Sequence, residues 1–294
     1  MTKLVLLGTG TPNACPYNSG PSSAVIVNDK AYIVDFGPGV VRQCSKAYFN
    51  GVKELHPKNL DIAFCTHLHS DHTAGLPDLM LTPWTLEREK PLKLIGPKGL
   101  KDMTDNITKA YSLDIDMRLN GDEPANLTGY KTIVKEIEPS FKSGFVYEDE
   151  NVRVEAFRVS HGKLQALAYK FYAADKTNLI SGDSKPLPIM IEKAKDVNIL
   201  LHEVEYTKGL ENRSKDWQEY HKNVHTLSKD LGYICKCAKP KLLVTYHRIY
   251  HMDIFSKDYD VLDEMKNRNK EIIQEIKDAG FDGNVVNGQD LDIY

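Results

Sequence analysis

Short apolar runs alternate with turn residues and with amphipathic stretches along most of the chain. Residues 3–7 form an apolar run of strand length that ends in a glycine-rich turn. Residues 24–27 and 32–35 are two further runs, separated by turn residues, and they predict a hairpin. Residues 40–49 and 262–279 have the apolar spacing of helices with one buried face. Strand-period and helix-period segments in one chain favour an α/β protein.

The second half of the chain repeats this mixture. A helix is predicted to open at His225 and to stop at Lys239-Pro240. The segment 204–223 has little periodicity, and the pattern leaves open a lid or a solvated loop. Residues 284–294 are read as a closing pair of strands. Five strands are predicted in this half, at residues 151–159, 167–171, 178–180, 196–201 and 241–245.

Composition limits the kinds of partner and cellular compartment to be expected. The 294 residues carry a formal net charge of −3, which argues against a general attraction to polyanions. The five cysteines are an odd number and include no Cys-x-x-Cys pair, which predicts a reducing compartment rather than a disulfide framework. No segment has the length of a membrane span or the pattern of a secretion signal. We therefore expect a cytoplasmic protein without a membrane partner.

The densest chemistry lies in the segment His67-Leu68-His69-Ser70-Asp71-His72, directly after the apolar run 61–66. Alternate residues of an extended segment point the same way, so His67 and His69 can share one metal ion. A reversal into the next helix then turns Asp71 and His72 toward a second ion about 3.5–4 Å away. Nitrogen and oxygen donors suit zinc and would also tolerate manganese or iron.

These residues resemble the metallo-β-lactamase superfamily, whose HxHxDH motif they match at every position. Three other stretches are similar to its ribonuclease Z-like branch. The resemblance implies a four-layer αβ/βα sandwich in a single domain covering residues 1–294, with a family-variable insertion at about 101–150. The three stretches are Gly8-Thr-Gly-Thr-Pro12, Val34-Asp-Phe-Gly-Pro-Gly39 and Ile95-Gly-Pro-Lys-Gly-Leu100.

The resemblance also implies a ligand set for two zinc ions. His67, His69 and His161 hold the first ion. Asp71, His72 and His247 hold the second, and Asp183 of a Ser-Gly-Asp motif bridges both. The branch more often places its last histidine directly after the strand's threonine. Here Tyr246 intervenes, so His251 remains the alternative to His247. Asp35 is read as a carboxylate that orients a metal histidine, with a helix cap as the alternative.

Such a centre activates water near neutral pH and stabilises charge that develops on an ester. The predicted catalytic residues are Asp71, His225 and Glu203, and Asp71 is also a ligand. In the resembling branch a glutamate behind a histidine keeps that ring protonated for the leaving group. The alternative is a capping histidine with a surface glutamate. His56, His202 and His221 are read as structural or solvated.

The predicted activity is metal-dependent hydrolysis of phosphodiester or sulfate esters of small molecules, like the phosphodiesterase and arylsulfatase relatives of the branch. Ribonuclease Z carries an RNA-gripping arm between its third and fourth motifs, and here His161 and Asp183 leave no space for one. The low net charge also disfavours nucleic acid. Transfer-RNA processing is the alternative enzyme function, and a non-catalytic metal-binding member is the other class. A homodimer is compatible with the sequence.

Overall fold

The computed structural model describes residues 1–294 and divides the chain into two compact units. The first unit consists of residues 1–8, 18–141 and 290–294, and the second of residues 9–17 and 142–289. Each unit is built on one mixed sheet with its own helices. The prediction of a single domain over the whole chain stays a prediction.

The sheet of the first unit has six strands in sequence order, from β1 to β6. The first three strands are antiparallel and the last three continue in parallel, as expected when helical segments connect them. The strands are β1 (Thr2–Gly8), β2 (Ser22–Val27), β3 (Lys30–Val34), β4 (Ile62–Phe64), β5 (Leu92–Pro97) and β6 (Thr132–Ile137). The predicted hairpin is therefore β2–β3.

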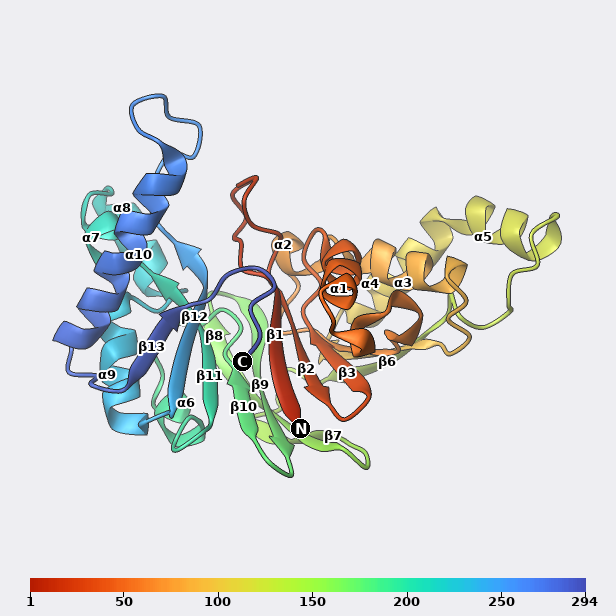
Figure 1. Ribbon diagram of the computed structural model, residues 1–294, viewed down its shortest axis with the longest axis horizontal. Coiled ribbons are helices and arrows are strands. Elements are labelled where there is room, and N and C mark those ends of the chain that lie inside the picture. The colour runs from red at the N-terminus through yellow and green to blue at the C-terminus, as the bar shows by residue number, and fades with distance from the viewer. The chain divides into compact units, whose positions relative to one another are not determined.

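The helices α1, α3 and α4 supply apolar side chains that pack against this sheet (Figure 1). The core combines alternate residues of the strands, such as Val5 and Leu7, with one face of each helix, such as Val41 and Leu79. This matches the strand period of two and the helix period of 3.6. The helices are α1 (Val40–Phe49), α2 (Ser70–Thr73), α3 (Leu76–Thr85), α4 (Leu100–Ala110) and α5 (Ser112–Asn120), and two short 3₁₀ turns are Lys53–Leu55 and Pro57–Asn59.

The first unit also contains the last five residues. Backbone amides and carbonyls of Leu4 and Tyr294 exchange two hydrogen bonds of 2.9 Å, so this segment runs along β1. Of the predicted closing pair of strands, only β13 (Asn284–Asn287) is a strand of a sheet. The prediction of a pair was wrong because the final residues bond to β1 rather than to their neighbours.

The sheet of the second unit has seven strands in the order β13-β12-β11-β10-β9-β8-β7. Strands β7 to β10 are antiparallel, and β10 to β13 are parallel. The strands are β7 (Ser143–Glu148), β8 (Val152–His161), β9 (Leu164–Ala173), β10 (Thr177–Ile180), β11 (Ile199–Glu205), β12 (Leu242–Ile249) and β13. Parallel strands place their carboxyl ends at one edge, where α/β proteins commonly bind ligands.

In the second unit α9 packs against α10 beside β11 to β13, and its apolar residues include Leu231 and Ile234 (Figure 1). The segment 204–223 is not an irregular loop, because it contains α7 and α8. The helix predicted from His225 begins three residues later, at Ser228. The helices are α6 (Pro188–Lys193), α7 (Thr207–Glu211), α8 (Lys215–Lys222), α9 (Ser228–Ala238) and α10 (Val261–Asp278).

Candidate metal centre and active site

The first group of metal-donor side chains follows β4 and belongs to the first unit. His67 and His69 precede α2, and α2 carries Asp71 and His72. Nε2 of His67 lies 3.1 Å from Nδ1 of His69. Nε2 of His72 lies 3.5 Å from a carboxylate oxygen of Asp71. The segment thus has the predicted form, an extended stretch that turns into a helix and brings two pairs of donors together.

Asp35 bonds to both sides of the donor segment His67–His72. Its carboxylate accepts hydrogen bonds from the backbone amide of Thr66 at 2.7 Å and from the Thr66 hydroxyl at 2.8 Å. The same carboxylate lies 2.8 Å from Nδ1 of His72, which leaves Nε2 of that ring for a metal. Asp35 therefore contacts a predicted metal histidine, as an orienting carboxylate would, and its orienting role stays a prediction. It does not cap α1, whose N-cap residue is Gly39 and has no side-chain cap.

Two glycines allow the close packing that this arrangement needs. A Cβ atom on Gly37 would lie 2.5 Å from the carbonyl oxygen of Asp71, and one on Gly75 would lie 2.4 Å from the carbonyl oxygen of Gly37. The backbone of Phe36 bonds to the end of α2 and to the start of α3, since its amide donates to the carbonyl oxygen of His72 and its carbonyl accepts from the amide of Gly75. The Val-Asp-Phe-Gly motif therefore serves as a platform for the donor segment.

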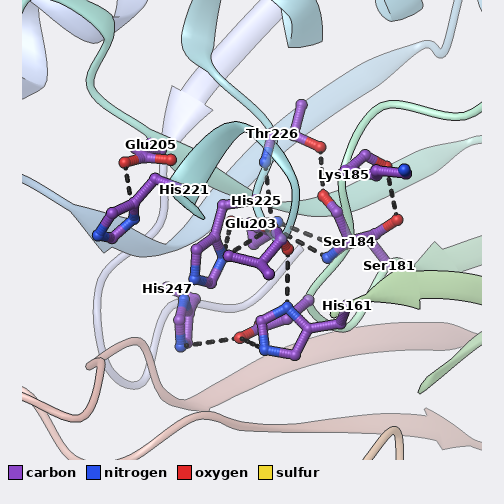
Figure 2. A network of polar contacts seen from close by, with 12 residues as sticks. His161, Ser181, Ser184, Lys185, Glu203, Glu205, His221, His225, Thr226 and His247 are labelled. Carbon is purple, nitrogen blue, oxygen red and sulfur yellow. Dashed lines mark hydrogen bonds and ion pairs between the residues drawn. The ribbon is translucent and has the colours of Figure 1, made fainter. Parts of the chain in front are cut away.

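A second donor group belongs to the second unit (Figure 2). His161, labelled in the figure, ends β8, and His247 lies near the end of β12. Asp183 follows β10. One carboxylate oxygen of Asp183 is 3.9 Å from Nε2 of His161 and 3.5 Å from Nε2 of His247. Nδ1 of His161 donates to the carbonyl oxygen of Val224 at 2.7 Å, which directs Nε2 toward Asp183.

A β-bulge explains the position of His247. Along β11 and β12, Glu203 pairs with Tyr246 and the next residue, Val204, pairs with Arg248. His247 is therefore the extra residue of β12, and its backbone has a left-handed φ of 44°. A bulge of this kind turns a side chain away from the regular alternation. The additional tyrosine after Thr245 is thus accommodated without moving His247 from the carboxyl end of the strand.

Glu203 and His225 form a buried pair next to this group. Nδ1 of His225 lies 3.1 and 3.2 Å from the two carboxylate oxygens of Glu203. The backbone amides of Ser184 and Thr226 also donate to Glu203, at 3.0 and 3.2 Å. Glu203 lies within β11, which extends beyond the predicted end at residue 201. The pair is therefore fixed by strand and backbone rather than by exposed side chains.

Donor atoms of His225 also lie close to the predicted ligands. Its ring nitrogen is within 4.8 Å of donors of His161 and Asp183, and a second group within that distance joins it to Glu203 and His247. The rings of His225 and His247 are stacked with centroids 5.9 Å apart. A proton held on His225 would therefore be available at the second donor group.

Burial shifts the titration of several groups here. It lowers the pKa of His161, although Asp183 opposes this change, and so favours the neutral ring that a metal needs. Burial, followed by the charge of Asp183, raises the pKa of Glu203 well above its ordinary value. Burial lowers the pKa of His202 to about 4. His202 is fully buried and its Nδ1 bonds to the carbonyl of Glu203, which agrees with the predicted structural role.

The donor spacing within each unit fits a divalent metal ion. Two ligand atoms bonded to one tetrahedral zinc ion are about 3.3 Å apart. The His67–His69, Asp71–His72 and Asp183–His247 separations of 3.1, 3.5 and 3.5 Å lie close to this value. Imidazole and carboxylate donors, with second ring nitrogens held by oxygen atoms, are a common zinc environment.

Several supporting residues were not identified from the sequence. Thr66, Ser184 and Thr226 act through backbone amides or a short hydroxyl contact, and no residue pattern marks such a role. His221 was read as structural or solvated, but it lies beside Glu205 (Figure 2). His251, the alternative to His247, also lies beside Glu205, at 2.5 Å. Glu205, His221 and His251 are far apart in the sequence and are linked only by their proximity in the fold.

The family is decided by a match of residues 2–254 to the family model described as Anti-Pycsar protein Apyc1. The chain belongs to this family. Among similar proteins, a ribonuclease Z of Mycobacterium marinum is 29% identical over 238 residues, which cover 76% of this chain and 79% of that protein. The predicted membership of the metallo-β-lactamase superfamily, in its ribonuclease Z-like branch, is confirmed.

Solved structures establish the fold of this Apyc1-family chain. The metallo-β-lactamase fold protein YhfI from Bacillus subtilis has a TM-score of 0.69 at 16% identity, over 100% of this chain and 98% of that one. The short form of human tRNase Z (ELAC1) has a TM-score of 0.70 at 19% identity, over 99% and 98%. The predicted α/β metallo-β-lactamase fold is confirmed. The relatives of this Apyc1-family chain include hydrolases by name, such as ribonuclease Z. None of its helices is long and apolar enough to cross a membrane.

Proposed function

We propose that this chain hydrolyses small phosphodiesters with two zinc ions. His67, His69 and His161 bind one ion in this proposal. Asp71, His72 and His247 bind the other, with Asp183 as the bridge. The resemblance of the motifs supports the assignment across the chain, and the donor spacing supports it within each unit. When bound, the two ions supply a water of low pKa and positive charge beside the phosphoryl oxygens.

The observation that carries the substrate class is the buried His225–Glu203 pair. Nδ1–H of His225 donates to Glu203, so Nε2 is the nitrogen that can protonate a departing oxygen. Glu203 is held in turn by the amides of Ser184 and Thr226, which fix the direction of the ring. A proton donor matters most when the leaving group is an alkoxide, as in phosphodiesters of sugars. Sulfate esters use the same parts and are the second member of the class.

The family description supports a small substrate. It names a protein that acts against Pycsar, and we propose the same role for this chain, with a compact phosphodiester as the bond that is broken. A 3′,5′-cyclic nucleotide is a compact biological phosphodiester with a sugar alkoxide as leaving group. It therefore suits a site whose proton donor is built into the protein.

Transfer-RNA processing is the second candidate, because curated relatives carry the name ribonuclease Z. Two observations weigh against it. The residues between His161 and Asp183 are occupied by β9 and β10, so no long arm is inserted there. The formal net charge of −3 offers no general attraction to an RNA backbone.

The test is a substrate panel with zinc-loaded protein. The panel contains purine and pyrimidine 3′,5′-cyclic nucleotides, a bis-aryl phosphate, an aryl sulfate, a lactone, a β-lactam and a precursor transfer RNA. We expect turnover of the phosphodiesters and little cleavage of the RNA. Site-specific cleavage on the 3′ side of the acceptor stem as the fastest reaction would establish the second candidate instead. Bound metal without turnover of any compound would indicate a non-catalytic member and refute the proposal.

A further inference from the structure

Glu205, His221 and His251 form a separate group of donor side chains in the second unit. Glu205 is the last residue of β11, His221 lies in the last turn of α8, and His251 follows β12. Nε2 of His251 lies 2.5 Å from Oε1 of Glu205. Nδ1 of His221 lies 2.9 Å from the same oxygen (Figure 2). Three distant segments of the chain thus direct donors at one carboxylate.

His251 bonds to one oxygen of Glu205, but two other polar atoms of this group lack a hydrogen-bond partner. Glu205 is fully buried, yet its Oε2 atom has no hydrogen-bond partner. The contact between His221 and Glu205 has the distance of an ion pair but not the direction of a hydrogen bond, so Nδ1 of His221 also lacks a hydrogen-bond partner. Buried polar atoms are nearly always paired with protein, water or an ion, so the unpaired Oε2 of the buried Glu205 points to a missing ligand.

We propose that Glu205, His221 and His251 bind a divalent metal ion of the zinc class, separate from the predicted dinuclear centre. Two histidines and a glutamate are a set that zinc accepts at three of its four positions, with water at the fourth. Two imidazoles bonded to one tetrahedral ion have ring centroids about 5 Å apart. The rings of His221 and His251 are 4.9 Å apart.

The surroundings favour ligation. Burial alone would raise the pKa of Glu205, but its contacts with His221 and His251 outweigh burial and lower that pKa, which keeps the carboxylate ionised. Metal binding requires this ionised form. His251 is held in a left-handed conformation with a φ of 55°, and Arg268 donates to its carbonyl oxygen at 2.9 Å. The backbone of His251 is therefore held before any ion binds, and its ring is held by the contact with Glu205.

The ion would anchor α8, which buries none of its residues. The carbonyl oxygen of His221 accepts the backbone amide of His225 at 2.8 Å. Binding at His221 would therefore also fix the segment that presents His225. This consequence rests on the proposed function, whereas the metal site itself does not.

The test compares metal content in the full-length protein. Wild type, Glu205→Gln and His221→Ala are stripped with a chelator, dialysed against buffered zinc and measured by elemental analysis. Glu211→Gln is the matched control, because it makes the same change at an exposed glutamate of α7. We expect wild type and control to bind one zinc ion more per chain than either variant. Equal zinc content in all four proteins would overturn the proposal.

Two further measurements keep the result interpretable. Far-UV circular dichroism checks folding, and His221→Ala decides the test if Glu205→Gln does not fold, because α8 has no buried residue to lose. The comparison is then repeated with Asp183→Ala in every protein, which disables the predicted dinuclear centre. The difference of one zinc ion should persist. A difference that disappears in this background would mean that Glu205 acts through the dinuclear centre, and the proposed site would be wrong.

Discussion

Asp35→Asn is expected to weaken metal binding by removing the orientation of His72 rather than a ligand. Asn has nearly the shape of Asp and readily adopts the left-handed φ of 58° found at this residue. Its amide, however, places an NH₂ group where one carboxylate oxygen stands. If that group faces His72, it meets the Nδ1–H of the ring, and the ring must move its hydrogen to Nε2. The nitrogen predicted to bind metal is then blocked. If the amide is flipped, the NH₂ group instead meets the backbone amide of Thr66.

The size of the effect follows from the single contact that is inverted. A hydrogen bond to a charged group is worth about 1.5–3 kcal/mol. Loss of an orienting partner of a metal histidine usually costs 10–100-fold in affinity, which is about 1.4–2.8 kcal/mol. The two ranges agree, so we expect zinc affinity at this group to fall 10–100-fold.

The measurement is competition for zinc against a chromogenic chelator at fixed pH. Asp61→Asn is the control, since Asp61 lies in the same unit and its carboxylate interacts with Lys90, at 3.7 Å, and with Arg88 rather than with a metal donor. Thermal unfolding of the metal-free proteins separates loss of affinity from loss of fold. Affinity within twofold of wild type in folded Asp35→Asn protein would refute the orienting role.

Three other predictions concern the second unit. His225→Ala should lower the turnover rate about 10²–10⁴-fold on an alkyl phosphodiester and much less on a nitrophenyl ester. Glu203→Gln should lower the rates in the same pattern but less strongly. Equal losses of rate on both esters would contradict the role of His225 as proton donor. Asp183→Ala should lower zinc content and abolish turnover, and full zinc occupancy with wild-type rates would contradict its bridging role. His202 has a folded-state pKa of about 4 against 6.5 ordinarily. Between pH 6.5 and pH 4 the unfolded chain therefore binds a proton that the folded chain does not. The free energy of unfolding is highest above pH 6.5 and falls by up to about 3 kcal/mol as the pH is lowered toward 4. His202→Gln should remove this pH dependence of the free energy of unfolding, measured by urea unfolding between pH 4 and 6.5. The same pH dependence in the variant as in wild type would contradict the prediction.

The regular elements were predictable where periodicity was strong. The helix at residues 40–49 was predicted with its observed bounds, and that at 262–279 within one residue at each end. β7 was not predicted, because only one residue of Ser143–Glu148 is buried and the strand shows no apolar alternation. α8 was missed because Trp217 and Tyr220 are its only large apolar side chains and neither is buried.

The site could be predicted only as far as its donors lie in short motifs. The spacing in the sequence alone predicts His67, His69, Asp71 and His72 as metal ligands. His161 and Asp183 needed the resemblance, because a single histidine or aspartate after a strand is common. The bulge at His247 left no sequence signal beyond an extra residue. The group around Glu205 depends on three segments that only tertiary structure brings together, so no local pattern reveals it.

The pairing of residues 290–294 with β1 has a consequence for synthesis on the ribosome. β1 emerges well before residues 290–294, which appear only after the intervening chain has been translated. At roughly 5–20 residues per second, the 149 residues from 142 to 290 take about 7–30 s. During that time the outer edge of β1 is open to other strands, including those of neighbouring nascent chains. The speed of translation over the second unit therefore determines how long the outer edge of β1 remains without its hydrogen-bonding partner.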